Sequence, residues 1–241
     1  MKKLLAAMFV ALLMVGCGGE GQNPEDSNDT EKNASALTPP VVQPIKTPFV
    51  KKWDEWEANP EPYGGIEVLA KIKEAEERGA TELDLGGNEI SDLSPLKGLT
   101  NLKELELWGN EITDVSPLKG LTKLKTLSPS RNQISDVSPL KGLTNLKRLA
   151  LNGNEISDVS PLKGLTNLTS LSLTKNQISD VSPLKGLTNL TSLSLSETQI
   201  SEVSSLAGLT NLVSLFLEKT QISEDQKAML RKALPDCDIT F

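Results

Sequence analysis

Leucine recurs along this chain at a fixed spacing, and that spacing decides which elements to expect. Seven units of 22 residues run from Ala80 to Ala233, and the fourth unit shows the pattern most cleanly. Its apolar positions and its asparagine are Leu146, Leu149, Leu151, Asn154, Ile156, Val159, Leu162 and Leu165. A fixed period of this length indicates a solenoid, in which each unit contacts mainly its neighbours.

A single unit cannot fold alone, because the entropy lost when its backbone is ordered costs more free energy than the burial of its apolar side chains contributes. The seven aliphatic side chains of the fourth repeat contribute about 1.5–3 kcal/mol each if they are fully buried. Ordering the backbone costs about 1–2 kcal/mol per residue, which exceeds that gain. Stacked units share hydrogen bonds and buried surface, so we expect the repeats to fold as a group.

Each repeat opens with a short alternating segment and then turns. In the pattern LxxLxL the first, fourth and sixth positions face the core, as they do in a strand. An amide at the turn can pair with backbone groups of its own and the adjacent repeat. The first five repeats carry it as Asn88, Asn110, Asn132, Asn154 and Asn176. Thr198 and Thr220 replace it in the last two repeats, so we expect the carboxyl end to be looser.

The return side of the repeats is marked by Ser-Pro-Leu, as in Ser116-Pro117-Leu118. Serine is a favourable helix cap, proline suits the first helical position, and a glycine follows at Gly120. The spacing leaves too few residues for a full helix. It therefore predicts one short 3₁₀ turn per repeat on the convex side.

Residues 49–79 are predicted to form an amino-terminal cap over the open end of the core. The cap is rich in aromatic residues, with a ligand pocket as the alternative role: Phe49, Trp53, Trp56 and Tyr63. A helix is predicted from about Ile66 to Arg78, ended by a left-handed Gly79. Its apolar stripe is Ile66, Leu69, Ile72 and Ala75, and its ion pairs are Glu67–Lys71 and Glu74–Arg78.

The carboxyl end is predicted to close the sheet with a helix and one more strand. Ser223 and Gln226 have capping-box spacing before a helical stretch, Glu224–Ala233. Residues 234–241 then resume the period, with Leu234, Cys237 and Ile239 at the LxxLxL positions. Cys237 is expected to be a small buried apolar residue, and a reactive thiol is the alternative.

The amino terminus has the features of an export signal. Lys2 and Lys3 precede an apolar run from Leu4 to Val15, which is short for a membrane span. Met14-Val15-Gly16-Cys17 resembles the lipobox of bacterial lipoproteins. The resemblance implies a signal peptide over residues 1–16, lipidation of Cys17 and, from Gly18, an outer-membrane location. Residues 17–48 are polar and predicted to be a disordered tether. The alternatives are a signal without lipid and an uncleaved anchor.

The repeats resemble the 22-residue leucine-rich repeats of internalin-type bacterial surface proteins. The residues that carry the resemblance follow LxxLxLxxNxIxDxxPLxxLxx over residues 80–241. It implies an α/β solenoid, a leucine-rich-repeat horseshoe with a parallel sheet on its concave face and 3₁₀ turns on its convex face. Proteins of this type commonly bind other proteins through the concave side.

Pro129 departs most from the pattern, since it takes the inward sixth position where Leu107 and Leu151 stand in the neighbouring repeats. Proline has no amide hydrogen for the ladder and is poorly suited to an interior strand. A designed kink or pocket is one interpretation of Pro129, and tolerated drift within a redundant array is the simpler one.

Outward strand positions vary between repeats while the return side barely changes, which places candidate binding residues on the concave face. An acidic group with a tryptophan comes first: Glu82, Asp84, Glu104, Glu106 and Trp108. Arg131 and Arg148 follow, and then a hydroxyl stretch that ends in an aromatic: Ser170, Ser172, Ser192, Ser194, Ser214 and Phe216. The carboxylates have three open interpretations, namely a solvated surface, a basic protein partner and a calcium site, although the shaped loop that calcium prefers is missing.

Composition removes several classes of function. The formal charge of −7 argues against nucleic acid as a partner, and the absence of histidine removes the usual general base and metal ligand. The carboxylates lie on an open sheet without a water-excluding cleft, so we expect neither an enzyme nor a cofactor. A protein-binding module anchored in the envelope and a structural envelope component are the two functions left.

Overall fold

The computed structural model describes residues 48–241, with side chains described from residue 52 onward. The predicted signal peptide, Cys17, the tether up to residue 47 and the side chain of Phe49 lie outside the described residues. Within residues 48–241, every helix is too short or too polar to cross a membrane.

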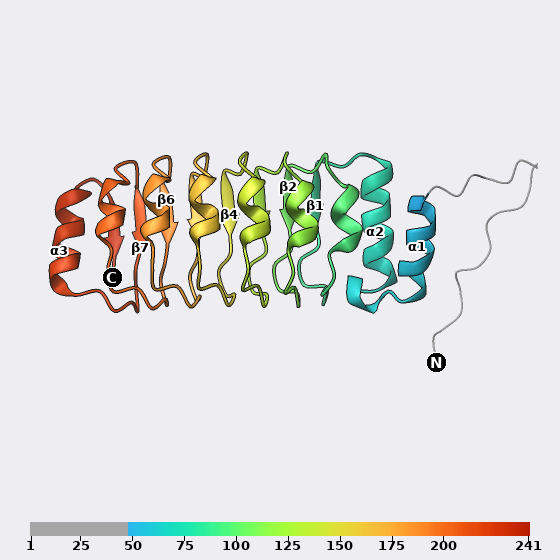
Figure 1. Cartoon of the computed structure of the whole chain (residues 1–241), viewed down its shortest axis with the longest axis horizontal. Helices are drawn as coiled ribbons and strands as arrows, with labels where there is room; N and C mark the ends of the chain where they lie inside the picture. Colours follow the sequence, from blue (N-terminus) through green and yellow to red (C-terminus); the bar gives the residue numbers. More distant parts are fainter. Residues whose placement is uncertain (1–47) are drawn as a thin grey trace, which may run out of the picture. The chain divides into compact units, whose positions relative to one another are not determined.

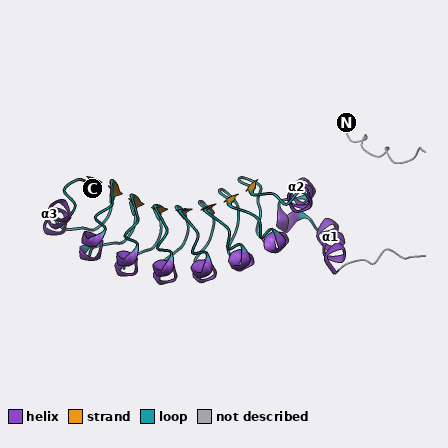
Figure 2. Ribbon diagram, turned by 90° about the horizontal axis from the view of Figure 1, so that it is seen from above, coloured by secondary structure: helices purple, strands orange, loops and turns teal. Residues whose placement is uncertain are grey.

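Eight parallel strands form one sheet in which the strand order follows the chain. The strands are β1 (Glu82–Asp84), β2 (Glu104–Glu106), β3 (Thr126–Ser128), β4 (Arg148–Ala150), β5 (Ser170–Ser172), β6 (Ser192–Ser194), β7 (Ser214–Phe216) and β8 (Asp238–Thr240). Equivalent residues of successive repeats pair directly, as Leu83 does with Leu105. Figure 1 shows the repeats side by side in chain order, and Figure 2 shows the strands on the inner side of a curve with the short helices on the outer side. This arrangement confirms the predicted leucine-rich-repeat horseshoe.

The first six repeats each contain one 3₁₀ helix, as predicted. They are η2 (Ser94–Gly98), η3 (Ser116–Gly120), η4 (Ser138–Gly142), η5 (Ser160–Gly164), η6 (Ser182–Gly186) and η7 (Ser204–Gly208). The prediction that serine caps them is wrong. Asp114 holds the start of η3 instead, since its Oδ1 accepts from the Ser116 N–H at 2.7 Å and its Oδ2 from the Ser116 hydroxyl at 2.8 Å. The aspartate two residues before the serine therefore caps the 3₁₀ helix, which is the role that the sequence predicted for serine.

The predicted inward positions form one continuous core. In the fourth repeat all seven aliphatic side chains are at most 2% exposed, and the same positions are buried in the neighbouring repeats. Each repeat thus covers the apolar surface of the next, and the burial that a lone repeat lacks is supplied by its neighbours.

The asparagines link successive repeats in the way the sequence predicts. Asn132 Oδ1 accepts from the Ile112 N–H at 3.0 Å, and its Nδ2 donates to the carbonyls of Leu107 and Pro129. Thr198 and Thr220 instead donate to carbonyls of their own repeats, those of Leu195 and Leu217. The side-chain link to the preceding repeat is therefore lost at the carboxyl end, and the looseness expected there stays a prediction.

Pro129 interrupts the ladder between β3 and β4. Leu107 donates its N–H to the Ser128 carbonyl and Leu151 donates to that of Ser172, a bond that proline at the equivalent position cannot make. The paired register between β3 and β4 stops at Leu127 and Leu149. The Pro129 carbonyl still accepts from Asn154 Nδ2 at 3.0 Å, so the asparagine column passes through this repeat unbroken.

The amino-terminal cap contains α1 (Pro48–Ala58), which the sequence analysis did not predict, then η1 (Glu61–Tyr63) and α2 (Ile66–Glu77). Trp53 is buried in the core, and its ring meets that of Trp56 edge to face at 5.0 Å. Trp56 and Tyr63 pack against the same core, so the predicted covering role is confirmed for Trp53, Trp56 and Tyr63, and that of Phe49 stays a prediction. Gly79, which follows α2, has the expected left-handed conformation at φ +61°.

Two details of α2 differ from the prediction. Ile66 is 51% exposed, because the core-facing side of the first turn is taken by Val68 and Leu69. Glu74 pairs with Arg78 as predicted, at 3.7 Å. Lys71 donates instead to the backbone carbonyl of Asp84 on the edge strand β1, where a carbonyl without a neighbouring strand needs a donor.

The carboxyl end consists of α3 (Glu224–Ala233) followed by β8. Ser223 caps α3 as predicted by accepting from the Gln226 N–H at 3.3 Å. The predicted register of the last strand is wrong by two residues, since Leu215 pairs with Ile239 and not with Cys237. An α-helix spans more residues than the 3₁₀ helix it replaces, so the strand starts later. Cys237 consequently lies before β8, half-buried, and burial raises the pKa of its thiol.

Candidate functional site

The concave face consists of three columns of side chains that run across the sheet. The first column is Glu82, Glu104, Thr126, Arg148, Ser170, Ser192, Ser214 and Asp238. The second is Asp84, Glu106, Ser128, Ala150, Ser172, Ser194, Phe216 and Thr240. The third follows the strands and is Gly86, Trp108, Ser130, Asn152, Thr174, Ser196 and Glu218.

All but one of the predicted binding residues lie in these columns. The exception is Arg131, whose prediction as an outward strand residue is wrong. β3 ends at Ser128, so Arg131 falls in the following turn, at the position that Gly109 and Gly153 occupy in adjacent repeats. The prediction also missed Thr126, Ser128, Ser130, Asn152 and Thr174, which the 22-residue spacing alone could have placed on this face.

The turn beside the sheet forces a left-handed backbone in every repeat. Glycine takes this position at Gly87, Gly109 and Gly153, but a long charged side chain takes it at Arg131, Lys175, Glu197 and Lys219, with φ of +55° to +56°. Such residues strain the backbone, and glycine does not. Glu197 Oε1 lies 3.9 Å from Lys175 Nζ and 3.5 Å from Lys219 Nζ, so these residues form a charged row along one edge of the concave face.

The amino half of the face is acidic and carries the exposed tryptophan. We call it the acidic half and define it as Glu82, Asp84, Glu104, Glu106 and Trp108. The register places Glu82 directly beside Glu104, and Asp84 beside Glu106. Trp108 is 45% exposed and is one of three exposed large apolar side chains among residues 52–241, with Ile66 and Val213. Like charges and an exposed indole thus share one small area.

The carboxyl half of the face is a network of hydroxyl groups. Thr174 Oγ1 and Ser194 Oγ are 2.5 Å apart. The hydroxyl of Ser196 donates to Glu218 Oε2, and Thr240 donates to Glu218 Oε1 at 2.8 Å. These two bonds, that from Ser196 foremost, hold the pKa of Glu218 below its ordinary value. Thr174 and Ser194 thus pair with each other, and Ser196 and Thr240 share the Glu218 carboxylate.

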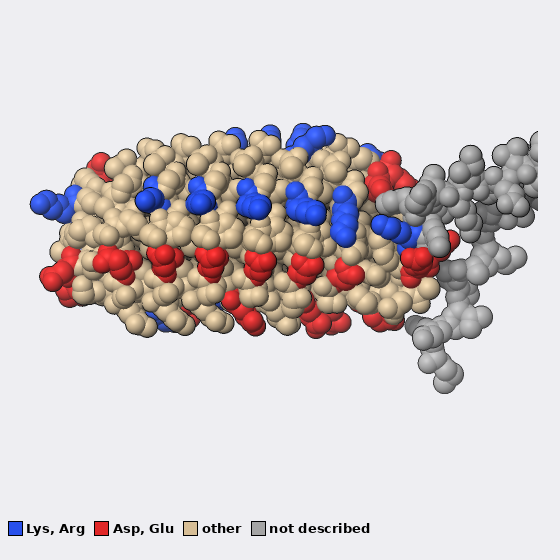
Figure 3. All heavy atoms as spheres, in the orientation of Figure 1, with Lys and Arg blue, Asp and Glu red and all other residues tan. Residues whose placement is uncertain are grey.

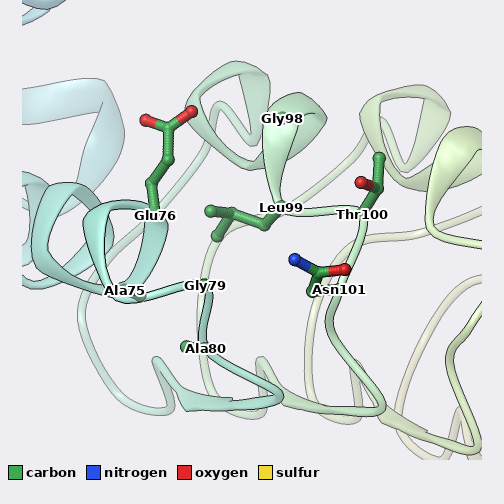
Figure 4. Close-up of a pocket in the computed structure, with 8 residues that line it drawn as sticks. All are labelled: Ala75, Glu76, Gly79, Ala80, Gly98, Leu99, Thr100 and Asn101. Atoms are coloured by element: carbon green, nitrogen blue, oxygen red, sulfur yellow. The ribbon is translucent and has the colours of Figure 1, made fainter.

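No cluster of three or more His, Cys, Asp or Glu side chains suited to a metal ion occurs within residues 48–241. A shallow pocket lies between the end of α2 and the return side of the first repeat, lined by Ala75, Glu76, Gly79, Ala80, Gly98, Leu99, Thr100 and Asn101 (Figure 4). Its one charged residue is Glu76, whose pKa is raised by burial. The pocket is separate from the concave columns.

The convex face is regular instead of variable. Figure 3 shows one basic and one acidic stripe across the face that carries the 3₁₀ helices. Each of η2 to η6 ends in the same lysine-glycine pair, and an aspartate side chain holds the serine at its start. These carboxylates are therefore committed to the fold.

Comparison with known protein families identifies the family to which the repeats belong. The family described as leucine-rich repeats (2 copies) matches residues 81–120, 100–142, 122–164, 144–186, 166–208 and 188–227. These segments cover more than half of the chain, so the chain belongs to the leucine-rich repeat family. A search of curated proteins finds no match at the sequence level.

Solved structures narrow the class of repeat. An internalin (inlC2) from Listeria monocytogenes is 44% identical with a TM-score of 0.64, over 67% of this chain and 70% of that one. An internalin (inlF) from the same species is 35% identical with a TM-score of 0.65, over 72% of this chain. The repeats are therefore internalin-like. The chain covers 54% of the length of that second internalin.

A third structure with lower sequence identity is a plant leucine-rich-repeat ectodomain in a complex. The leucine-rich-repeat ectodomain of the Arabidopsis thaliana membrane receptor kinase GASSHO1/SCHENGEN3 was solved in complex with Casparian strip integrity factor 2. It is 25% identical with a TM-score of 0.54, over 62% of this chain and 20% of that one.

Proposed function

We propose that this protein binds a protein partner through the concave face of its sheet. The observation that carries the proposal is the concentration of sequence variation on that face. Ser-Pro-Leu-Lys-Gly recurs unchanged in η2 to η6, whereas the outward columns change from acidic to basic to hydroxylic residues. The constant return side is explained by the fold, because its aspartates hold the 3₁₀ helices. The step from acidic to hydroxylic residues along the concave face is what a spacer does not require and a partner does.

The kind of partner is supported by the class of protein. Proteins with this repeat commonly recognise other proteins on an extended surface, and the Arabidopsis ectodomain was solved with the factor that it binds. A shallow curved sheet offers area and not enclosure, which suits a polypeptide better than a small molecule. The chain covers about half of one internalin, so the partners of the internalins are not carried over.

We further propose that the protein is exported and held by lipid in the bacterial envelope, in the outer membrane. Met14-Val15-Gly16-Cys17 and the following Gly18 support this, together with the apolar run from Leu4. Acyl chains on Cys17 would hold the chain at a membrane, because each buried methylene contributes about 0.8 kcal/mol. The polar stretch that follows would let the repeats reach partners away from that surface.

Photocrosslinking tests the binding face directly. A photoreactive residue is placed at Ser172 or Ser194 on the concave columns, and at Lys141 on the convex face as a matched control. In cells that make the protein naturally, the concave positions should give one adduct of defined mass and the control should give none. Equal adducts from both faces, or none from either, would contradict the proposal.

The lipid anchor has its own test. Globomycin should block maturation, and mass spectrometry of the mature amino terminus should show an acylated Cys17. A free Cys17 thiol on the mature protein would rule out the anchor and leave the binding proposal intact.

A further inference from the structure

Trp108 lies on a seat made by glycines of the preceding repeat. A Cβ atom on Gly86 would fall 2.3 Å from indole Nε1 and Cε2, so only glycine leaves room for the ring there. A Cβ on Gly87 would lie 3.6 Å from the far edge of the same ring. The indole therefore rests against backbone on one side, and it remains 45% exposed. A ring held in this way is a ready platform for a flat or cationic group.

The glutamates of the acidic half are not held in ion pairs within the part of the chain that the structure describes. The side chains of Glu82, Glu104 and Glu106 make no ion pair or hydrogen bond within residues 52–241. Like charges directly opposite each other destabilise a sheet, and here two such pairs lie side by side. Lys71 brings one positive charge to the edge of the acidic half, where its ammonium group donates to the Asp84 backbone carbonyl. One cation beside four carboxylates leaves the area acidic. The arrangement is unfavourable by itself and becomes favourable when a cation is brought by a partner.

The spacing suits an extended chain with basic side chains. Neighbouring strands lie about 4.8 Å apart and alternate residues of one strand about 6.6 Å apart. A planar guanidinium can bond both oxygens of a carboxylate in a fork while its flat face stacks on an indole. An ammonium group can lie near both partners, as Lys73 does with Glu57 and Trp53, but it offers neither the fork nor the flat face. The carboxyl half makes a useful contrast, because the Glu218 carboxylate is already held by Ser196 and Thr240.

We propose that the acidic half binds an extended, arginine-bearing peptide segment of the partner, with one arginine stacked on Trp108 and paired with Glu106, and the next basic side chain along the peptide paired with Glu104. This inference rests on the proposed function, and it specifies which half of the face takes the charged part of the partner and what chemistry that part carries.

Peptide titration tests the inference. Calorimetry of the full chain in detergent uses three capped octapeptides that alternate serine with arginine, lysine or glutamate. The arginine peptide should bind, the lysine peptide at least threefold more weakly, and the glutamate peptide not at all. Affinity for the arginine peptide should fall as salt rises, because the contact is charged.

Matched variants distinguish binding at the acidic half from a general effect of the protein's net charge. Glu104→Gln with Glu106→Gln should weaken arginine-peptide binding at least tenfold, and Trp108→Leu at least fivefold. Glu111→Gln with Glu155→Gln changes the net charge equally at exposed positions off the sheet and should stay within twofold. Circular dichroism confirms that each variant is folded.

Two outcomes would overturn the inference, namely no binding of the arginine peptide or equal weakening by the Glu111 and Glu155 control. If crosslinks still form at Ser172 or Ser194 in that case, the proposed function survives and only this inference fails. If the arginine peptide binds but no concave position crosslinks a partner, the proposed function fails and the peptide site stands.

Discussion

The two faces of this solenoid come from the same repeats but follow different constraints. On the convex face the aspartate that holds each 3₁₀ helix and the proline and leucine that follow recur almost unchanged. On the concave face, one position of the strands carries glutamate, threonine, arginine and serine in turn. The residues of the return side are constrained because the backbone of each 3₁₀ helix needs hydrogen-bond partners. The outward residues of the strands carry no such constraint, so their identity can be selected for binding a ligand.

The largest expected effect is on binding. Glu104→Lys with Glu106→Lys should lower the yield of the Ser172 crosslink roughly 10–100-fold, since reversed charges meet a basic partner unfavourably. The midpoint of thermal unfolding should not fall, because both side chains point away from the core. Glu111→Lys with Glu155→Lys is the matched control. A lost crosslink accompanied by a lower midpoint would mean that the concave side is also needed for folding.

A second prediction concerns the repeat that breaks the pattern inside the core. Pro129→Leu should raise the free energy of unfolding by about 2 kcal/mol, because it adds buried aliphatic surface and restores an N–H for the Ala150 carbonyl. Denaturant unfolding measures it. No change, or a loss, would show that the neighbouring repeats have packed around proline.

The charged row at the edge of the concave face gives a smaller effect. Lys175→Gly should raise the free energy of unfolding by roughly 0.5 kcal/mol, since relief of the left-handed strain slightly exceeds the added entropy of glycine. The ion pair that it loses, with Glu197, is exposed and contributes little. Lys185→Gly, in the last turn of η6, should instead lower the free energy of unfolding, because glycine is entropically unfavourable where no left-handed strain is relieved. A destabilised Lys175 variant would mean that the side chain is held by more than this ion pair.

The smallest effect is the acid dependence of the convex face. Hydrogen bonds from the Ser182 N–H and hydroxyl lower the pKa of Asp180. A lowered pKa in the folded state means that the stabilisation is present above the unfolded value, about 3.9, and is lost as pH falls through the folded value. Asp180→Asn should therefore make stability less steeply dependent on pH below about 4. An unchanged slope would show that this bond is not retained in solution.

Most of the fold could be predicted because the same spacing of apolar residues and asparagine recurs in successive repeats. The inward leucines, the asparagine column and the 3₁₀ helices follow from spacing alone, and the structure agrees with each. The errors fall where a repeat is interrupted. Ile239 takes the place expected for Cys237 because α3 is longer than the helix it replaces, and no period encodes that difference.

The candidate site was less predictable for a related reason. Alternation placed Glu82 and Glu104 on the outward surface correctly, but it ends with the strand. Arg131 lies beyond that point, where a left-handed turn takes over. The seat of Trp108 could not be read from spacing either, since it depends on the absence of a side chain at Gly86 in another repeat. Contacts between repeats, unlike burial within them, require the structure.

Two asparagines of one repeat test whether the buried positions stabilise the fold while the outward positions of the concave face do not. Asn154 is buried and makes three hydrogen bonds, to Pro129, Leu151 and Ile134, whereas Asn152, two residues earlier, faces outward in the third column. Denaturant unfolding should show that Asn154→Ala loses about 3 kcal/mol while Asn152→Ala stays within about 0.5 kcal/mol of the parent. Equal losses from the two alanines would contradict the account.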